Sequence, residues 1–140
     1  MRVMMLMYPG PNAETETEPT DGNPDLLTAM LAFNQRMIDA GVLISGDGLK
    51  PTRNGKRVRF GKGKPVITDG PFTETKEILG GFWMLQVASF DDAVRWASEA
   101  PCPAGEMIEV RQVWEPEDFG PDVAEKERQM IKDISAGKKG

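Results

Sequence analysis

The pattern of apolar and polar positions along the chain predicts four strands that share one sheet. Residues 1–8 and 82–88 are almost continuously apolar, as in strands that are buried on both faces. The segments 42–49 and 106–114 carry β-branched and other apolar residues between turn-forming residues, which is also typical of strands. We therefore expect a sheet built from these four segments.

Two further segments repeat apolar residues at helical spacing. The first follows Asn23-Pro24, an N-cap residue with proline at the first helical position, and predicts a helix over about residues 24–40. The second follows Ser89, another N-cap residue, and ends before Pro101. We expect one helix in each segment.

The predicted order of elements is β-α-β-β-α-β with an extra hairpin. Residues 56–60 and 65–68 would form this hairpin around a Gly-Lys-Gly-Lys turn. The order is that of a ferredoxin-like fold, in which both helices pack on one face of an antiparallel sheet. The predicted fold class is therefore α+β.

The second face of this sheet is predicted to be apolar as well. In the first strand Val3, Met5 and Met7 would point one way and Met4, Leu6 and Tyr8 the other, and in the strand at 82–88 Trp83, Leu85 and Val87 would oppose Phe82 and Met84. The two helices can cover only one of these apolar faces. A monomer would expose the other as a larger apolar patch than soluble proteins usually tolerate. We expect a homodimer in which two of these open sheet faces pack together. The alternative is that the C-terminal tail of the same chain covers the face.

The chain is expected to form one domain, residues 1–114, followed by a charged C-terminal extension, residues 115–140. The extension has a weak amphipathic pattern, so we expect it to be partly helical. Its apolar content is low, and for this reason a second copy is favoured over the tail as the cover of the open sheet face.

Charge and cysteine content limit the partners and the compartment. The net charge of −5 argues against a general affinity for nucleic acid. Basic residues do cluster between Lys50 and Lys64, but Phe60 is the only aromatic residue there, so we interpret the cluster as the solvated edge of the hairpin. No apolar run is long enough to span a bilayer. A single cysteine, Cys102, suits a reducing compartment, and we expect a cytoplasmic protein that binds neither nucleic acid nor membrane.

The chain contains no histidine, which removes the usual general base near neutral pH and the commonest transition-metal ligand. Four carboxylates have the oxygen atoms that a hard cation prefers, namely Asp47, Asp69, Glu74 and Glu77. Their spacing matches no calcium-binding loop. We therefore expect no metal and no cofactor, and any acid–base chemistry would depend on carboxylates, Lys76 or Tyr8.

A string of fifteen residues, DGPFTETKEILGGFW at 69–83, resembles the signature of the DGPF, or YCII-related, family. Two more matching pieces lie at fitting distances, AGVLISGDGL at 40–49 and IEVRQVW at 108–114. The resemblance covers about residues 1–114. It implies a dimeric α+β barrel of ferredoxin-like subunits, and it implies no reaction because the family is largely uncharacterised.

The resemblance also has a gap. YCII proteins in the narrower sense resemble one another around a His–Asp pair suspected of catalysis, and this chain has no histidine to supply it. Some related proteins accompany sigma factors of the extracytoplasmic-function class, which implies a regulatory alternative.

The tetrapeptide at residues 69–72 is typical of a turn. Asp69 can accept hydrogen bonds from backbone N–H groups two residues on, and Gly70 permits a positive φ. Pro71 fixes the next φ, and Phe72 can fill a pocket wall or a dimer interface. Turn chemistry therefore explains the tetrapeptide without a ligand.

The charged residues after this turn have two interpretations. Alternating Glu and Lys residues usually form a solvated surface. Alternatively they border a cleft floored by the sheet, which is a common location for ligand sites. The candidate ligand-binding residues are then Asp47, Asp69, Phe72, Glu74, Lys76, Glu77 and Arg111. A carboxylate buried near another there would have a raised pKa and could act as a base.

Two functional hypotheses follow. The first is a small-molecule site, enzymatic or sensory, near residues 69–81. The second is an interaction module without chemistry, which acts on another protein such as a sigma factor. The first is our working hypothesis. The sequence identifies no substrate, reaction or partner, and it does not decide whether the protein is an enzyme.

Overall fold

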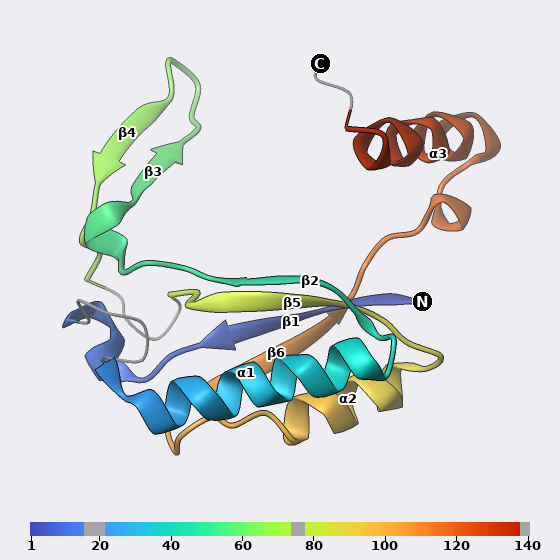
Figure 1. Ribbon diagram of the computed structural model, residues 1–140. Helices are drawn as coiled ribbons and strands as arrows, with labels where there is room; N and C mark the ends of the chain where they lie inside the picture. Colours follow the sequence, from blue (N-terminus) through green and yellow to red (C-terminus); the bar gives the residue numbers. More distant parts are fainter. Residues whose placement is uncertain (16–21, 74–77, 138–140) are drawn as a thin grey trace.

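A mixed α+β fold with an antiparallel sheet is present, as predicted (Figure 1). The computed structural model describes residues 1–15, 22–73 and 78–137. The main sheet has the strand order β2-β5-β1-β6, and all its pairings are antiparallel. This is the order of a ferredoxin-like sheet, made from two split β-α-β units. The strands are β1 (Arg2–Tyr8), β2 (Leu43–Gly48), β5 (Gly81–Gln86) and β6 (Met107–Gln112).

Both predicted helices are present and begin at the predicted N-cap residues. Helix α1 spans Pro24–Asp39, and the Asn23 side chain accepts hydrogen bonds from two backbone N–H groups of its first turn at 3.1 and 3.2 Å. Helix α2 spans Phe90–Ser98, and the Ser89 hydroxyl accepts one from the backbone of its first turn at 3.1 Å. These local bonds satisfy N–H groups that have no partner within the helix, which fixes where each helix starts.

The core lies between the main sheet and the two helices. Val3 and Leu85 are cross-strand neighbours, and both are fully buried together with Met37 of α1. The Phe33 ring packs edge-on against Trp83, with 5.9 Å between ring centroids, an arrangement that aromatic pairs favour. The buried residues of this cluster are Val3, Met5, Phe33, Met37, Trp83, Leu85, Val87 and Ala93.

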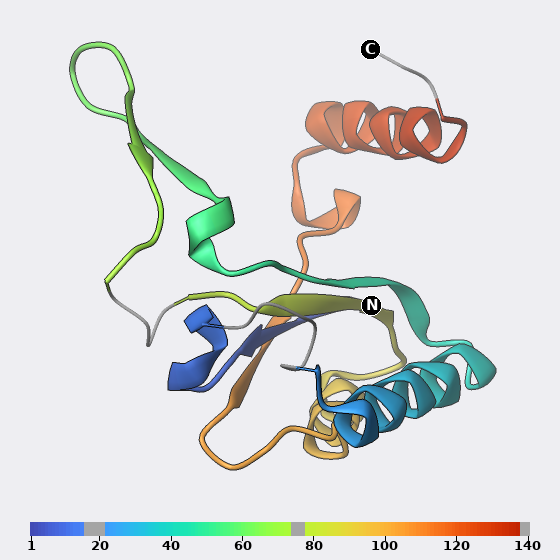
Figure 2. The same ribbon diagram turned by 60° about the vertical axis from the view of Figure 1, so that its left-hand side comes forward.

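The predicted hairpin forms a small sheet of its own. Strands β3 (Lys56–Arg59) and β4 (Val66–Asp69) pair antiparallel, and all eight residues are exposed. Figures 1 and 2 show the hairpin projecting from the main sheet on the side opposite α1 and α2. A short 3-10 turn, Thr52–Asn54, connects it to β2.

A third helix, α3 (Pro121–Ser135), lies within the C-terminal extension. It projects on the same side of the sheet as the hairpin but at the other end (Figure 1). Its main contacts are with the 3-10 turn Pro116–Asp118, and no strand of the sheet is among the main contacts in the described ranges. In this structure the tail therefore does not cover the open sheet face. None of the described helices is both long and apolar enough to cross a membrane.

The open sheet face is apolar at its centre, as predicted. Met4 lies opposite Met84, and Leu6 lies opposite Phe82 on the neighbouring strand. All four side chains are only half-buried, whereas their neighbours on the helix side are buried. Tyr8 extends the face, opposite Met107 on β6. The central strand β1 therefore presents apolar side chains on both faces.

Two adjacent residues of α1 provide a test of this core. Replacing Met37, which is fully buried, by alanine leaves a cavity between α1 and the sheet and is expected to cost about 3 kcal/mol. Replacing Ile38, which is 52% exposed, is expected to cost less than about 1 kcal/mol. Urea denaturation at one protein concentration measures both. Equal costs would contradict the packing described here.

Candidate functional site

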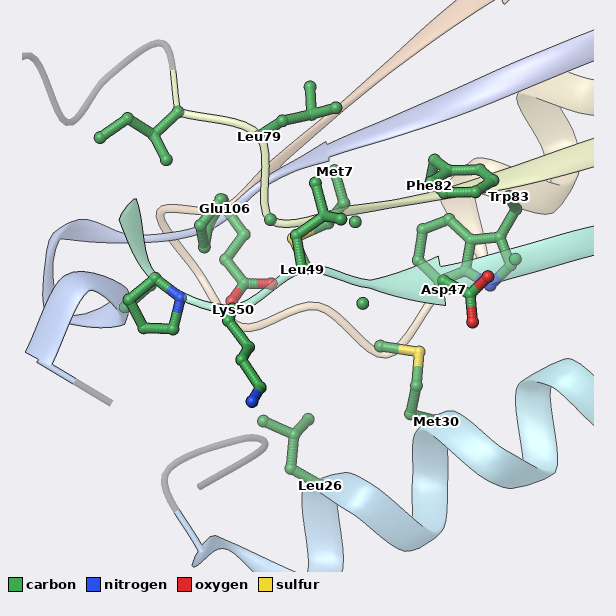
Figure 3. A pocket seen from close by; sticks show the side chains of 18 of the residues that line it. Met7, Leu26, Met30, Asp47, Leu49, Lys50, Leu79, Phe82, Trp83 and Glu106 are labelled. Carbon is green, nitrogen blue, oxygen red and sulfur yellow. The ribbon is translucent and has the colours of Figure 1, made fainter. Parts of the chain in front are cut away.

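A cavity of about 810 Å³ opens between α1 and the edge of the sheet formed by β2 and β5 (Figure 3). Helix α1 contributes apolar side chains from its N-terminal half, and the sheet contributes those at the start of β5 and just after β2. The apolar residues labelled in the figure include Leu26, Met30, Leu49, Leu79, Phe82 and Trp83. The walls are therefore mainly hydrophobic, as in most small-molecule sites.

Among the described residues, five charged ones line this cavity: Glu14, Asp47, Lys50, Arg53 and Glu106. Asp47 comes from β2, Lys50 from the residues that follow β2, and Glu106 from the loop before β6 (Figure 3). A hydrogen bond fixes one wall of the cavity: the Trp83 indole N–H donates to the Asn34 side-chain oxygen at 2.8 Å. Because Trp83 is almost completely buried, this bond satisfies an N–H that water does not reach. In the described ranges no group of three or more Cys, Asp or Glu side chains is placed to hold a metal ion.

Glu106 is partly withdrawn from water by the loop that carries it. The backbone N–H of Glu106 donates to the Pro103 carbonyl oxygen at 3.2 Å, which turns the chain back on itself before β6. Burial raises the pKa of the Glu106 carboxyl, and a hydrogen bond from the Cys102 thiol lowers it by a smaller amount. A carboxylate with a raised pKa holds a proton more readily than an ordinary one and is a better base once ionised.

Cys102, in the same loop, is held in its neutral form. Burial raises the pKa of the Cys102 thiol to about 11, and the charge of Glu106 adds to the effect. The thiolate is the reactive form of cysteine, so this residue is a poor nucleophile near neutral pH. The thiol here acts as a hydrogen-bond donor to Glu106.

Glycines shape the sheet side of the cavity. A Cβ atom at Gly81 would lie 2.9 Å from the Asp47 carbonyl oxygen, so β2 can approach β5 here only because residue 81 has no side chain. A Cβ atom at Gly80 would lie 2.8 Å from the Pro9 ring. By contrast, a Cβ atom at Gly48 would meet no atom within 4 Å, because it would point into open space. The bulge in β2 lies between Leu43 and Ser45, at the other end of the strand from this glycine.

The tetrapeptide at 69–72 packs against the 3-10 turn Thr52–Asn54 and not against the cavity. Gly70 donates its N–H to the Gly55 carbonyl oxygen at 3.0 Å, and Phe72 donates its N–H to the Thr52 hydroxyl at 3.0 Å. A Cβ atom at Gly70 would lie only 1.7 Å from the Thr52 carbonyl oxygen. Our expectation of a positive φ at Gly70 is wrong, since Gly70 is not among the glycines with positive φ. Glycine is required at position 70 because the backbone there passes too close to the Thr52 carbonyl group to leave room for a side chain.

Glu14 holds this turn from the other side, and sequence reasoning missed it. Its carboxylate accepts hydrogen bonds from the Thr52 backbone N–H at 2.9 Å and from the Thr52 hydroxyl, and its carbonyl oxygen accepts one from Arg53 at 2.8 Å. No local pattern marks Glu14, because its partners lie almost forty residues away in the chain. It links the segment after β1 to the base of the hairpin.

The ligand-binding candidates that the structure describes lie in different parts of the molecule. Asp47 lines the cavity. Asp69 is exposed on β4 and forms an ion pair with Lys56 at 2.8 Å. The Arg57 guanidinium stacks on the Phe72 ring, with its central carbon 3.8 Å from the ring centroid. The inserted hairpin thus carries residues 69–72 away from the sheet edge.

The other predicted residues lie elsewhere or outside the description. Arg111 lies opposite Met4 on the neighbouring strand. Its exposed side chain forms an ion pair with Glu109, with 3.9 Å between Nε and Oε2. Glu74, Lys76 and Glu77 lie outside the described residues. Ligand contact by these four residues stays a prediction. Lys50 and Glu106 of the cavity were not among the candidates, although an acidic residue at the start of an apolar strand segment was a visible signal for Glu106.

Comparisons with known proteins place the chain in a family. The family model for the YCII-related domain matches residues 1–117. An uncharacterized protein of Rhizobium meliloti (strain 1021) is 37% identical over 68 residues, which are 49% of this chain and 55% of that protein. The matched part therefore spans about half the length of this curated relative.

Among solved structures, one similar chain is 5-chloro-2-hydroxyhydroquinone dehydrochlorinase (TftG) from Burkholderia phenoliruptrix AC1100, in complex with 2,5-dihydroxybenzoquinone. The two chains are 14% identical, and the superposition has a TM-score of 0.47 and covers 86% of this chain and 100% of that one.

The packing of the tetrapeptide can be tested with two glycines. The Gly70→Ala change is expected to destabilise the protein by about 3 kcal/mol, because its Cβ cannot fit beside the Thr52 carbonyl group. The Gly61→Ala change is the control, since a Cβ there meets no atom within 4 Å. Urea denaturation compares the two variants. If Gly70→Ala were as stable as Gly61→Ala, the close approach would be refuted.

The environment of Cys102 predicts slow alkylation. With a pKa of about 11, the native thiol should react with iodoacetamide at pH 8 about 100-fold more slowly than the same thiol in urea-unfolded protein. The rate should rise as the pH approaches 11, and Glu106→Gln should raise the rate at pH 8 because it removes a charge that holds the pKa up. Mass spectrometry of the alkylated protein measures each rate. Equal rates for native and unfolded protein at pH 8 would contradict this environment.

Proposed function

The chain belongs to the YCII-related domain family, and we propose that it binds a small, mainly apolar molecule in the cavity between α1 and the β2–β5 edge. The observation that carries the proposal is the combination of a cavity of about 810 Å³ with a few charged groups on apolar walls. Ligand sites in proteins commonly enclose some 300–1,000 Å³ and have this composition.

The polar groups of the cavity indicate the chemistry of the ligand. Asp47 and Glu106 are carboxylates and accept hydrogen bonds, so they match hydroxyl or amine groups of the ligand. Lys50 supplies a positive charge at the same cavity and matches an acidic group. A compact hydroxylated molecule, aromatic or aliphatic, with one acidic group satisfies both features. Where such a molecule carries an acidic proton, Glu106 is the group positioned to accept it.

We further propose that the protein is a homodimer joined through the open sheet face, which makes a dimeric α+β barrel. The support is the pair of contacts Met4–Met84 and Leu6–Phe82, which stay half-buried while the helix side of the same strands is buried. Apolar surface of this kind is stabilised when a second apolar surface removes it from water. The alternative occupant is a different protein, such as a sigma factor. We assign the surface to a second copy because two identical apolar faces cover each other.

A thermal-shift screen of hydroxylated carboxylic acids tests the ligand site. A compound at a concentration of 100 Kd is expected to stabilise the native protein by about 2.7 kcal/mol, which raises the Tm by several degrees. The Gly48→Leu variant should lose this shift, because the new side chain enters the cavity without meeting other atoms. Glu106→Gln should weaken binding about tenfold, since it replaces a charged acceptor by a neutral one.

The matched control is Gly61→Leu, a glycine with equally open surroundings outside the cavity, and it should keep the full shift. Absence of any stabilising compound, or a compound that binds Gly48→Leu as well as the natural protein, would refute the proposed site.

A further inference from the structure

Two parts of the chain project from the main sheet on its open side. We call residues 56–69 the hairpin arm and residues 115–135 the C-terminal arm. Figures 1 and 2 show the two arms at opposite ends of the sheet, both on the side away from α1 and α2. Each arm is joined to the domain only at its base, so most of its surface faces solvent or the space above the open sheet face.

Both arms carry exposed apolar side chains. Phe60 and Ile67 of the hairpin arm are 79% and 64% exposed, and Val58, the cross-strand neighbour of Ile67, is exposed on the same face. On α3, three exposed residues recur at helical spacing and form one stripe: Val123, Met130 and Ile134. Contiguous apolar surface of this kind is unusual on a monomer and indicates a contact surface.

The arms differ in charge. Seven basic residues and no acidic residue lie between Lys50 and Lys64, and five of them belong to the hairpin arm. The C-terminal arm contains seven acidic and three basic residues, a net charge of −4. Surfaces of opposite charge attract one another and specify which surface meets which.

The C-terminal arm is also held in one shape. Arg2 at the start of β1 forms an ion pair with Glu115 at 2.9 Å, which anchors the base of the arm. At the same base, the ring of Trp114, the residue before the arm, lies 6.1 Å from the Phe119 ring between centroids. A contact surface that is already ordered loses less entropy when it binds.

We propose that each hairpin arm packs against the C-terminal arm of a second copy of this chain. This inference rests on the proposed homodimer. When two open sheet faces pack around a two-fold axis, one of the two orientations that keep the strands aligned brings the hairpin end of one copy above the C-terminal end of the other. Because the arms have opposite charges, this orientation is favoured over the one that brings like arms together. The two-fold axis then produces the same contact twice.

Charge reversal tests the contact. The hairpin variant carries Arg59→Glu, Lys62→Glu and Lys64→Glu, and the arm variant carries Glu125→Lys, Glu127→Lys and Asp133→Lys. The net charge of the hairpin arm becomes −2 and that of the C-terminal arm becomes +2. Each variant alone should have a dimer Kd at least about tenfold higher than the natural protein, because both copies of the contact become repulsive. An equimolar mixture of the two variants should form heterodimers of nearly natural affinity, since one contact is restored with reversed charges and the other is unaltered. Analytical ultracentrifugation measures the Kd values, and circular dichroism checks that each variant is folded.

The outcomes separate this inference from the proposed dimer. Arg95→Glu, on the exposed surface of α2, is the control and should leave the Kd unchanged. A dimer that is unaffected by either reversal overturns the arm contact and leaves the sheet-face dimer standing. A natural protein that is a monomer at micromolar concentration overturns both.

Discussion

The central constraint on this structure is that its middle strand is apolar on both faces. β1 lies between β5 and β6 and pairs with both, and its apolar side chains from Val3 to Met7 point alternately to the two faces of the sheet. The two helices cover Val3 and Met5, whereas Met4 and Leu6 are left half-buried. Burial of apolar surface is the main force that stabilises a fold. The rest of the architecture therefore depends on what covers the second face.

The glycines of the string at residues 69–83 allow close packing against neighbouring segments. Gly70 allows the chain to touch the Thr52 turn, and Gly80 and Gly81 allow Pro9 and β2 to come close to the start of β5. These glycines set the distance between the sheet edge and its neighbours, and the cavity lies at this edge. The end of the string, residues 78–83, thus forms part of the cavity wall, while the charged groups of the cavity come from residues elsewhere in the chain. A specific sequence signature is therefore compatible with a structural role.

The elements were predictable because local chemistry determines them. Asn23 and Ser89 satisfy the first N–H groups of their helices, and the apolar runs of β1 and β5 have no other stable use than a buried strand. The site was less predictable. Asp69 and Phe72 come before β5 in the sequence, but Asp69 belongs to the hairpin and Phe72 is bound to Thr52, which holds both away from the sheet edge. Glu14 and Glu106 obtain their roles from contacts with distant segments or from the fold of a loop, which no periodicity in the sequence reveals.

The proposed dimer and the proposed ligand site meet at one residue. Phe82 lies opposite Leu6 on the open sheet face, and it also lines the cavity between α1 and the sheet edge. Asp47 pairs with Phe82 from the neighbouring strand and lines the same cavity. A second copy that covers the open face restricts the Phe82 ring, because close-packed neighbours leave a side chain few rotamers. A wall that is already ordered binds a ligand with a smaller loss of entropy. The proposed dimer would therefore strengthen binding at the proposed site, and by linkage the ligand would stabilise the dimer equally.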